Sequence, residues 1–73
     1  MKIKCLHDTG KELSQKYLDH GWLKTSEMDL IIDQEYMVYG IAFFKNDINE
    51  YLVVDKYNKK NAKINDLMVI NIS

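Results

Sequence analysis

The residues best suited to chemistry stand near the start of the chain, where Cys5, His7 and Asp8 lie close together. A thiol acts as a nucleophile when a base within hydrogen-bond reach takes its proton. The alternation from Lys2 to His7 predicts a strand with Cys5 and His7 on one face. Side chains two residues apart on a strand do not point at each other well enough for that transfer. The simpler interpretation is a small buried cysteine, and we expect no enzyme.

The same three residues together with His20 also offer donor atoms to a metal ion. Zinc sites usually contain two pairs of Cys or His, each spaced by two to four residues. This chain has one cysteine and two histidines, so a second pair is missing. Its three glycines lie far apart and form no phosphate-binding loop. We therefore expect neither a metal nor a cofactor.

A late segment of the chain gathers four lysines around Tyr57: Lys56, Lys59, Lys60 and Lys63. Proteins that bind single-stranded nucleic acid combine positive charge with aromatic rings that stack on bases. The whole chain has a net charge of −1 and no arginine, which argues against a general nucleic-acid binder. The ordinary interpretation is a solvated loop. A nucleic-acid-binding module that uses the Lys56–Lys63 loop stays open as an alternative.

Four carboxylates surround a short apolar run near the middle of the chain: Glu27, Asp29, Asp33 and Glu35. Residues 27–55 hold seven acidic residues and one lysine. Surface carboxylates steer a basic partner and raise its association rate. A solvated loop would produce the same pattern. We therefore take these four residues as a hypothesis for a partner-binding surface.

The elements that position these residues are those of one small domain, spanning residues 1–73. Alternating apolar residues predict strands at residues 2–7, 36–44, 50–54 and 67–72. The stretch 36–44 is apolar on both faces, which indicates a central or strongly curved strand. Gly40 in its middle marks a bend or a close backbone approach.

One short helix is expected between residues 11 and 21. Leu13, Tyr17 and Leu18 follow helical spacing, and Gly21 has the character of a helix stop. A helix of two turns is too short to be stable alone, so it must pack on the core. Trp22 is expected to anchor it there.

Four or five short strands in a chain of this length favour a mainly β fold. We predict a small antiparallel barrel that closes its own edges, with the helix in the connection after the first strand. Its core is expected to include Tyr36, Val38, Ile41, Val53 and Ile70. One cysteine, no apolar leader and no apolar run of membrane-spanning length predict a cytoplasmic protein.

The segment from Leu30 to Ile41 resembles a pattern found in short bacterial proteins. In these, a hydrophobic pair and a turn precede a Glu/Lys-Tyr-x-Val-Tyr-Gly-Ile strand. The segments Tyr51–Asp55 and Leu67–Ile70 are similar to the strands that follow. Such proteins are SH3-like small barrels, and some are associated with toxin-immunity loci.

This resemblance implies an SH3-like barrel and an immunity protein that neutralises a cognate bacterial toxin by covering it. The acidic residues would then suit a basic toxin surface. The chain lacks the proline usually found before the last strand of these proteins. No functional residue can be transferred from the family. A structural protein that associates with itself, as a homo-oligomer, is a third possibility.

Overall fold

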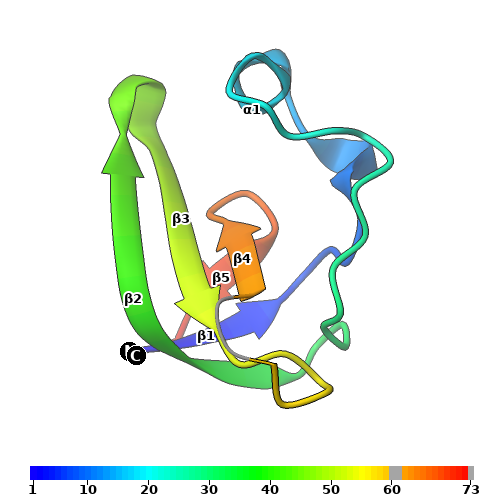
Figure 1. The fold of residues 1–73 in the computed structure, drawn as a ribbon, viewed down its shortest axis with the longest axis vertical. Coiled ribbons are helices and arrows are strands. Elements are labelled where there is room, and N and C mark those ends of the chain that lie inside the picture. The colour runs from blue at the N-terminus through cyan, green and yellow to red at the C-terminus, as the bar shows by residue number, and fades with distance from the viewer. Residues whose placement is uncertain (60–61, 73) are drawn as a thin grey trace.

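The structure is a computed structural model, and it describes residues 1–59 and 62–72. That part of the chain forms a mainly β domain with one short α-helix (Figure 1). The strands are β1 (Lys2–Cys5), β2 (Glu35–Phe44), β3 (Ile48–Val53), β4 (Ala62–Asn65) and β5 (Val69–Asn71). The helix α1 covers Gln15–Asp19, and single 3₁₀ turns cover Gly10–Glu12 and Lys45–Asp47.

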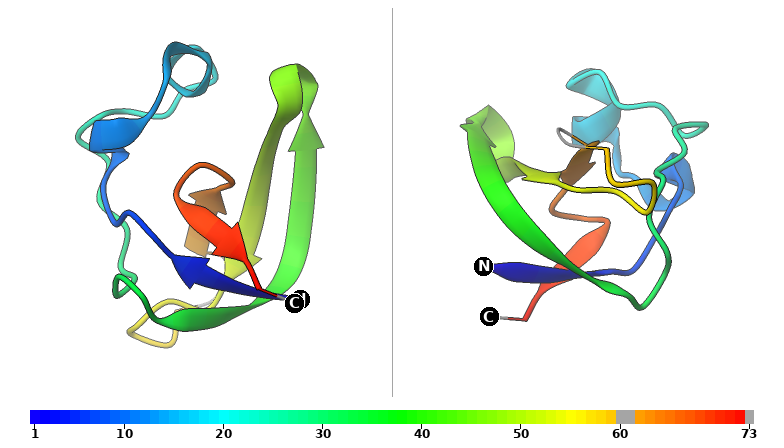
Figure 2. Two further views of the ribbon diagram at one scale, coloured as in Figure 1. Left: turned by 180° about the vertical axis from the view of Figure 1, so that it is seen from behind. Right: turned by 60° about the horizontal axis from the view of Figure 1, so that its bottom comes forward.

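The five described strands form one antiparallel sheet in the order β4-β3-β2-β1-β5. Ile3 of β1 lies opposite Tyr36 on one side and Asn71 on the other. The chain ends therefore meet at one side of the molecule, as Figure 2 shows. The expected antiparallel, mainly β fold is confirmed.

The expected closure of the sheet into a barrel is not found. Among the described residues no ladder joins the edge strands β4 and β5. These strands have four and three residues, and a tight turn joins them. In this turn the Met68 N–H donates to the Asn65 carbonyl, while the Met68 carbonyl accepts from Leu6 and His7. These bonds hold the turn against the segment that follows β1.

The long strand β2 serves both parts of the sheet. Residues Glu35–Met37 pair with β1, and Val38–Phe44 pair with β3. A β-bulge between Val38 and Gly40 interrupts the second ladder. A Cβ on Gly40 would lie 2.9 Å from Cδ1 of Leu52, so the close neighbour of this glycine is a side chain and not the backbone.

The core lies between β1, the inner face of β2 and β3, and the connection that follows β1. Tyr36, Val38 and Val53 are buried in it, as predicted. The prediction was wrong for Ile41 and Ile70, which are 42% and 48% exposed. Ile41 lies beyond the bulge toward the free end of the hairpin, and Ile70 sits on an edge strand opposite Lys4.

The connection between β1 and β2 contains α1, within the predicted window. The second part of this connection, which leads to β2, is hydrogen-bonded to the end of β1 and to the residues that follow it. Met28 N–H donates to the Asp8 carbonyl, and Asp33 N–H donates to the Cys5 carbonyl, both at 2.7 Å. Tyr17 on α1 is buried, and its hydroxyl donates to Asp66 at 2.7 Å. The short helix is thus stabilised by tertiary contacts.

No helix in residues 1–59 and 62–72 has the length and apolar character needed to cross a bilayer.

Candidate functional site

An open groove of about 380 Å³ lies between the end of α1 and the β2–β3 hairpin. In Figure 1, α1 and the hairpin tip stand opposite each other at the top of the molecule. We call this hollow the Trp22 groove. Its lining residues are His20, Gly21, Trp22, Leu23, Ser26, Phe44, Glu50 and Lys63.

Trp22 reaches the groove because of how α1 ends. Gly21 has a φ of +115°, a conformation that glycine adopts easily and that turns the chain out of the helix. The Gly21 N–H donates to the Leu18 carbonyl, and the Trp22 N–H donates to the Tyr17 carbonyl, both at 3.1 Å. These two bonds are those of a Schellman motif. The helix stop therefore fixes the position of Trp22.

The wall opposite Trp22 carries a carboxylate. Glu50 lies on β3, and its side chain is 12% exposed. Its Oε2 accepts a hydrogen bond from the indole Nε1 of Trp22 at 2.9 Å and lies 3.6 Å from Nε2 of His20. The His20 ring meets the Phe44 ring edge-on, with centroids 4.4 Å apart. The groove thus combines aromatic surface with one mostly buried negative charge.

A second hollow of about 220 Å³ is lined by Glu27, Met28, Asp29, Asp55, Ala62 and Lys63. We call it the acidic hollow. The Asp55 carboxylate accepts hydrogen bonds from the backbone N–H groups of Tyr57 and Lys59, at 2.8 and 2.9 Å, and so organises its own turn. The side chains of Glu27 and Asp29 in this hollow are exposed. Lys63 lines both hollows, so the two adjoin.

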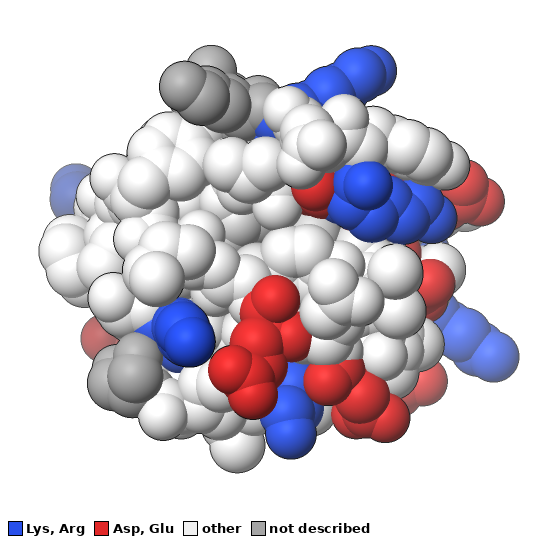
Figure 3. Space-filling model, turned by 90° about the horizontal axis from the view of Figure 1, so that it is seen from below, with Lys and Arg blue, Asp and Glu red and all other residues white. Residues whose placement is uncertain are grey.

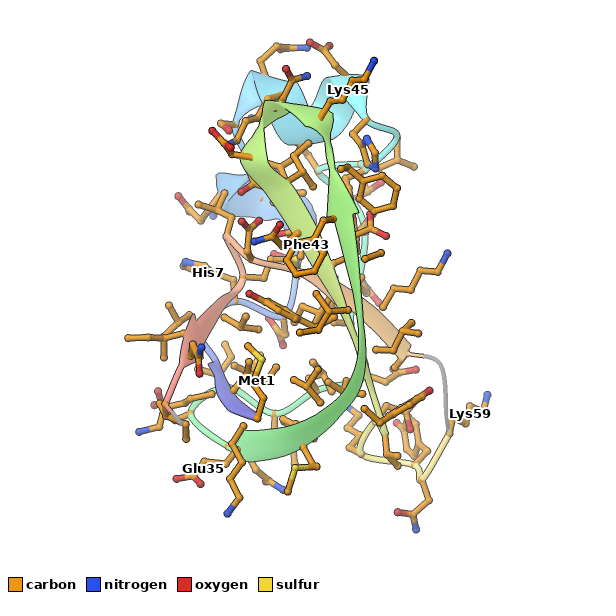
Figure 4. All side chains as sticks on the ribbon, turned by 90° about the vertical axis from the view of Figure 1, so that its left-hand side faces the viewer. Met1, His7, Glu35, Phe43, Lys45 and Lys59 are labelled. Atoms are coloured by element: carbon orange, nitrogen blue, oxygen red, sulfur yellow. The ribbon has the colours of Figure 1, made fainter. Side chains whose placement is uncertain are left out.

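The structure brings two of the four predicted acidic residues together. Glu27 and Asp29 line the acidic hollow, whereas Asp33 and Glu35 are not among its lining residues. Glu35 begins β2 and lies opposite Lys4 of β1. In Figure 4 it stands at the end of the molecule away from the hairpin tip that carries Lys45. Carboxylates and lysines also stand side by side on the face shown in Figure 3, so no field of one sign covers it.

Cys5 is buried, and its thiol donates to the His7 carbonyl oxygen at 3.4 Å rather than to an imidazole. Burial, with a further contribution from the negative charge of Asp8, raises the pKa of Cys5 from 9.0 to about 11. The thiol is therefore protonated at neutral pH. Within the described residues no three His, Cys, Asp or Glu side chains are grouped so that they could hold a metal ion.

The lysine segment is partly described. Lys56 places its Nζ 5.3 Å from the ring centroid of Tyr57, and the Tyr57 side chain is exposed. Lys59 extends at the edge of the molecule in Figure 4, away from Glu35. Lys60 lies outside the described residues.

Sequence reasoning did not identify the Trp22 groove. It placed Trp22 as an anchor for the helix, and it did not single out Phe44 or Glu50. The available signal was a tryptophan directly after a helix-stop glycine, since that position is fixed by the helix end.

No family model matches the chain, and neither a curated protein nor a solved structure is detectably similar to it.

Proposed function

We propose that this chain is an SH3-like domain that acts without catalysis, by binding another protein. Its specific form would be an immunity protein that neutralises a cognate bacterial toxin by covering it. The observation that carries the proposal is the Trp22 groove, an open surface where Trp22 and Phe44 stand beside the carboxylate of Glu50. Buried cores of binding interfaces are enriched in such aromatic side chains.

The SH3-like part of the proposal is supported by the strand order, in which β1 lies between β2 and β5. It is also supported by the long connection after β1 and by a curved β2 that serves both parts of the sheet. The toxin-immunity part rests on the resemblance of Leu30–Ile41, Tyr51–Asp55 and Leu67–Ile70 to short bacterial proteins.

Large exposed side chains favour a protein partner over a small molecule. Leu23 and Phe44, which both line the groove, are 62% and 41% exposed. Single exposed apolar residues are common, but several beside one groove are typical of an interaction surface. We propose that Glu27, Asp29, Asp33 and Glu35 contribute by steering a basic partner toward this surface.

The test starts from the partner that affinity capture recovers from the native host. Two double variants are then compared, one that reverses Glu27 and Asp29 to lysine and one that reverses Lys56 and Lys59 to glutamate. We expect the acidic reversal to slow association, and more so at low salt, because charge steering is screened over about 10 Å at 0.1 M salt. The lysine reversal should have little effect.

A Glu35→Lys variant separates the two ends of the predicted acidic surface. If it slows association as much as the Glu27 and Asp29 reversal does, the whole acidic group takes part in steering. If the ligand is a nucleic acid, the lysine reversal should have a larger effect than the acidic reversal, because loss of Lys56 and Lys59 would then abolish binding. Capture of nucleic acid in place of a protein, with that ranking, would refute the proposed function.

A further inference from the structure

The two hollows share one lining residue and are lined by neighbouring residues of the connection after β1. Ser26 lines the Trp22 groove, its neighbour Glu27 lines the acidic hollow, and Lys63 lines both. An extended chain advances about 3.3 Å per residue. A short linear segment of a partner is therefore able to contact both hollows at once.

The apolar part of this surface is built to hold a side chain. Trp22 is partly buried and packs against the core, and its ring is fixed by the hydrogen bond to Glu50. Phe44 is fixed by its ring contact with His20. Aromatic rings held in this way offer contact area at low cost in conformational entropy.

The charged part of the surface is Glu50. The contacts from Trp22 Nε1 and His20 Nε2 both reach its Oε2, and a carboxylate has two oxygens that each accept hydrogen bonds. A mostly buried carboxylate gains most from a cationic donor, because charged hydrogen bonds are stronger away from water. The chemistry of the site is thus complementary to Lys or Arg.

We infer that the Trp22 groove and the acidic hollow together bind an extended segment of the partner protein, with an apolar side chain against Trp22 and Phe44 and a Lys or Arg at Glu50. The segment continues toward Glu27 and Asp29, where further basic residues are favoured. This inference rests on the proposed protein-binding function, and it names what that function recognises.

Lys63 allows a second test, because it lines both hollows and is the residue they share. Its positive charge opposes a basic segment. Replacing Lys63 with glutamine should strengthen binding, whereas replacing Glu50 with glutamine should weaken it. If the bound molecule is an acidic segment or a nucleic acid, the Lys63 replacement should weaken binding and the Glu50 replacement should strengthen it.

The experiment selects a library of random peptides displayed on phage against the immobilised protein. Enriched peptides without tryptophan are synthesised and titrated, and Trp22 emission is recorded, since Trp22 is the only tryptophan of the chain. The variants are Glu50→Gln and Lys63→Gln. Glu12→Gln is the matched control, because Glu12 is an exposed acid on the 3₁₀ turn Gly10–Glu12. Thermal unfolding of each variant checks that it folds.

We expect the library to converge on peptides that pair an aromatic or aliphatic residue with Lys or Arg. Glu50→Gln should weaken their binding by roughly tenfold or more, as expected for the loss of a charged hydrogen bond. Glu12→Gln should leave it unchanged. No enrichment, enrichment of acidic peptides, or equal affinity for Glu50→Gln would overturn the inference.

The inference and the proposed function can fail separately. If the natural partner binds Glu50→Gln as tightly as the unmodified protein, protein binding stands and the groove assignment is wrong. If Trp22 emission depends on protein concentration alone, a second copy of the chain covers the groove, and the inference is overturned. If only nucleic acid binds, both fail.

Discussion

The two halves of β2 belong to one strand and have very different surroundings. In Glu35–Val38, the inward residues Tyr36 and Val38 are buried. Beyond the bulge, Ile41 and Phe43 are just as apolar and remain exposed. The first half pairs with β1 from Glu35 to Met37, and β5 flanks β1 in turn. From Val38 onward β2 pairs with β3, and its second half runs out into the hairpin tip.

Apolar character alone therefore does not distinguish core from interface. The same alternation yields packed side chains where other elements cover the strand and exposed ones where none do. The packed half should therefore govern stability, while the projecting half and the groove beside it should govern binding.

The largest expected effect comes from matched truncations in the two regions. Ile3 is fully buried opposite Tyr36, whereas Ile41 belongs to the projecting half. Ile3→Ala should lower the free energy of unfolding by roughly 2–5 kcal/mol, the range for a buried isoleucine. Ile41→Ala should cost roughly 1 kcal/mol or less. Urea denaturation measures the free energy of unfolding of each variant. Equal decreases for the two variants would contradict a difference between the two halves of β2.

Alkaline pH should destabilise the protein through the packed region. The pKa of Cys5 is raised from 9.0 to about 11 in the folded state, mainly by burial. Between these values the unfolded chain releases a proton that the native state keeps, so stability falls as pH rises from 9 toward 11. The loss is about 1.4 kcal/mol per pH unit at most.

Urea midpoints measured between pH 7 and pH 10.5 would show this decline, and Cys5→Ala should make it shallower. Tyr17, whose pKa is also raised by burial and by its hydrogen bond to Asp66, adds to the decline above pH 10 in both proteins. Identical slopes with and without Cys5 would contradict the assignment.

Two aromatic residues of the connection after β1 should differ in the same way. Each donates a side-chain hydrogen bond to a carboxylate, Tyr17 to Asp66 in the core and Trp22 to Glu50 in the groove. Tyr17→Phe should lower stability by about 1–2 kcal/mol and leave peptide affinity unchanged. Trp22→Phe should mainly lower affinity. Calorimetry measures both the stability and the peptide affinity of each variant. If Tyr17→Phe lowers the affinity and Trp22→Phe lowers only the stability, the binding surface lies at α1.

The smallest effect is expected at the hairpin tip, where two consecutive residues have positive φ values. Asn46 has a φ of 66° and Asp47 a φ of 59°. Glycine adopts this conformation without steric cost, so Asp47→Gly should raise stability by roughly 0.5–1 kcal/mol. Asp47→Ala is the control and should lower it. A lower melting temperature for Asp47→Gly would show that the Asp47 side chain stabilises the turn.

Local patterns predicted the parts of the fold that local chemistry determines. The spacing around Tyr17 and the stop at Gly21 located α1, and Gly40 marked the irregular part of β2, where a bulge lies between Val38 and Gly40. The strand β4 was missed. It has four residues and ends in Asn65, which is fully buried although polar, with its Oδ1 accepting from the Leu67 N–H. A buried asparagine breaks the pattern on which strand prediction depends.

The candidate site was less accessible to such reasoning. Trp22, Phe44, Glu50 and Lys63 come from separate segments, and only the folded sheet brings them to one groove. The acidic residues are adjacent in sequence, yet β1 draws Glu35 to its own side while Glu27 and Asp29 go to the acidic hollow. Of the four acidic residues that lie close together in the sequence, only Glu27 and Asp29 are therefore grouped in the acidic hollow.

The position of β1 between β2 and β5 has a consequence for how the protein reaches this fold. Contacts such as Ile3 with Asn71 join residues from opposite ends of the sequence. Proteins with many such contacts fold more slowly than those with local ones, because a long loop must close first. Until β5 docks, one edge of β1 exposes unpaired backbone groups to neighbouring chains. The time before β5 docks is thus when the chain is most prone to aggregate.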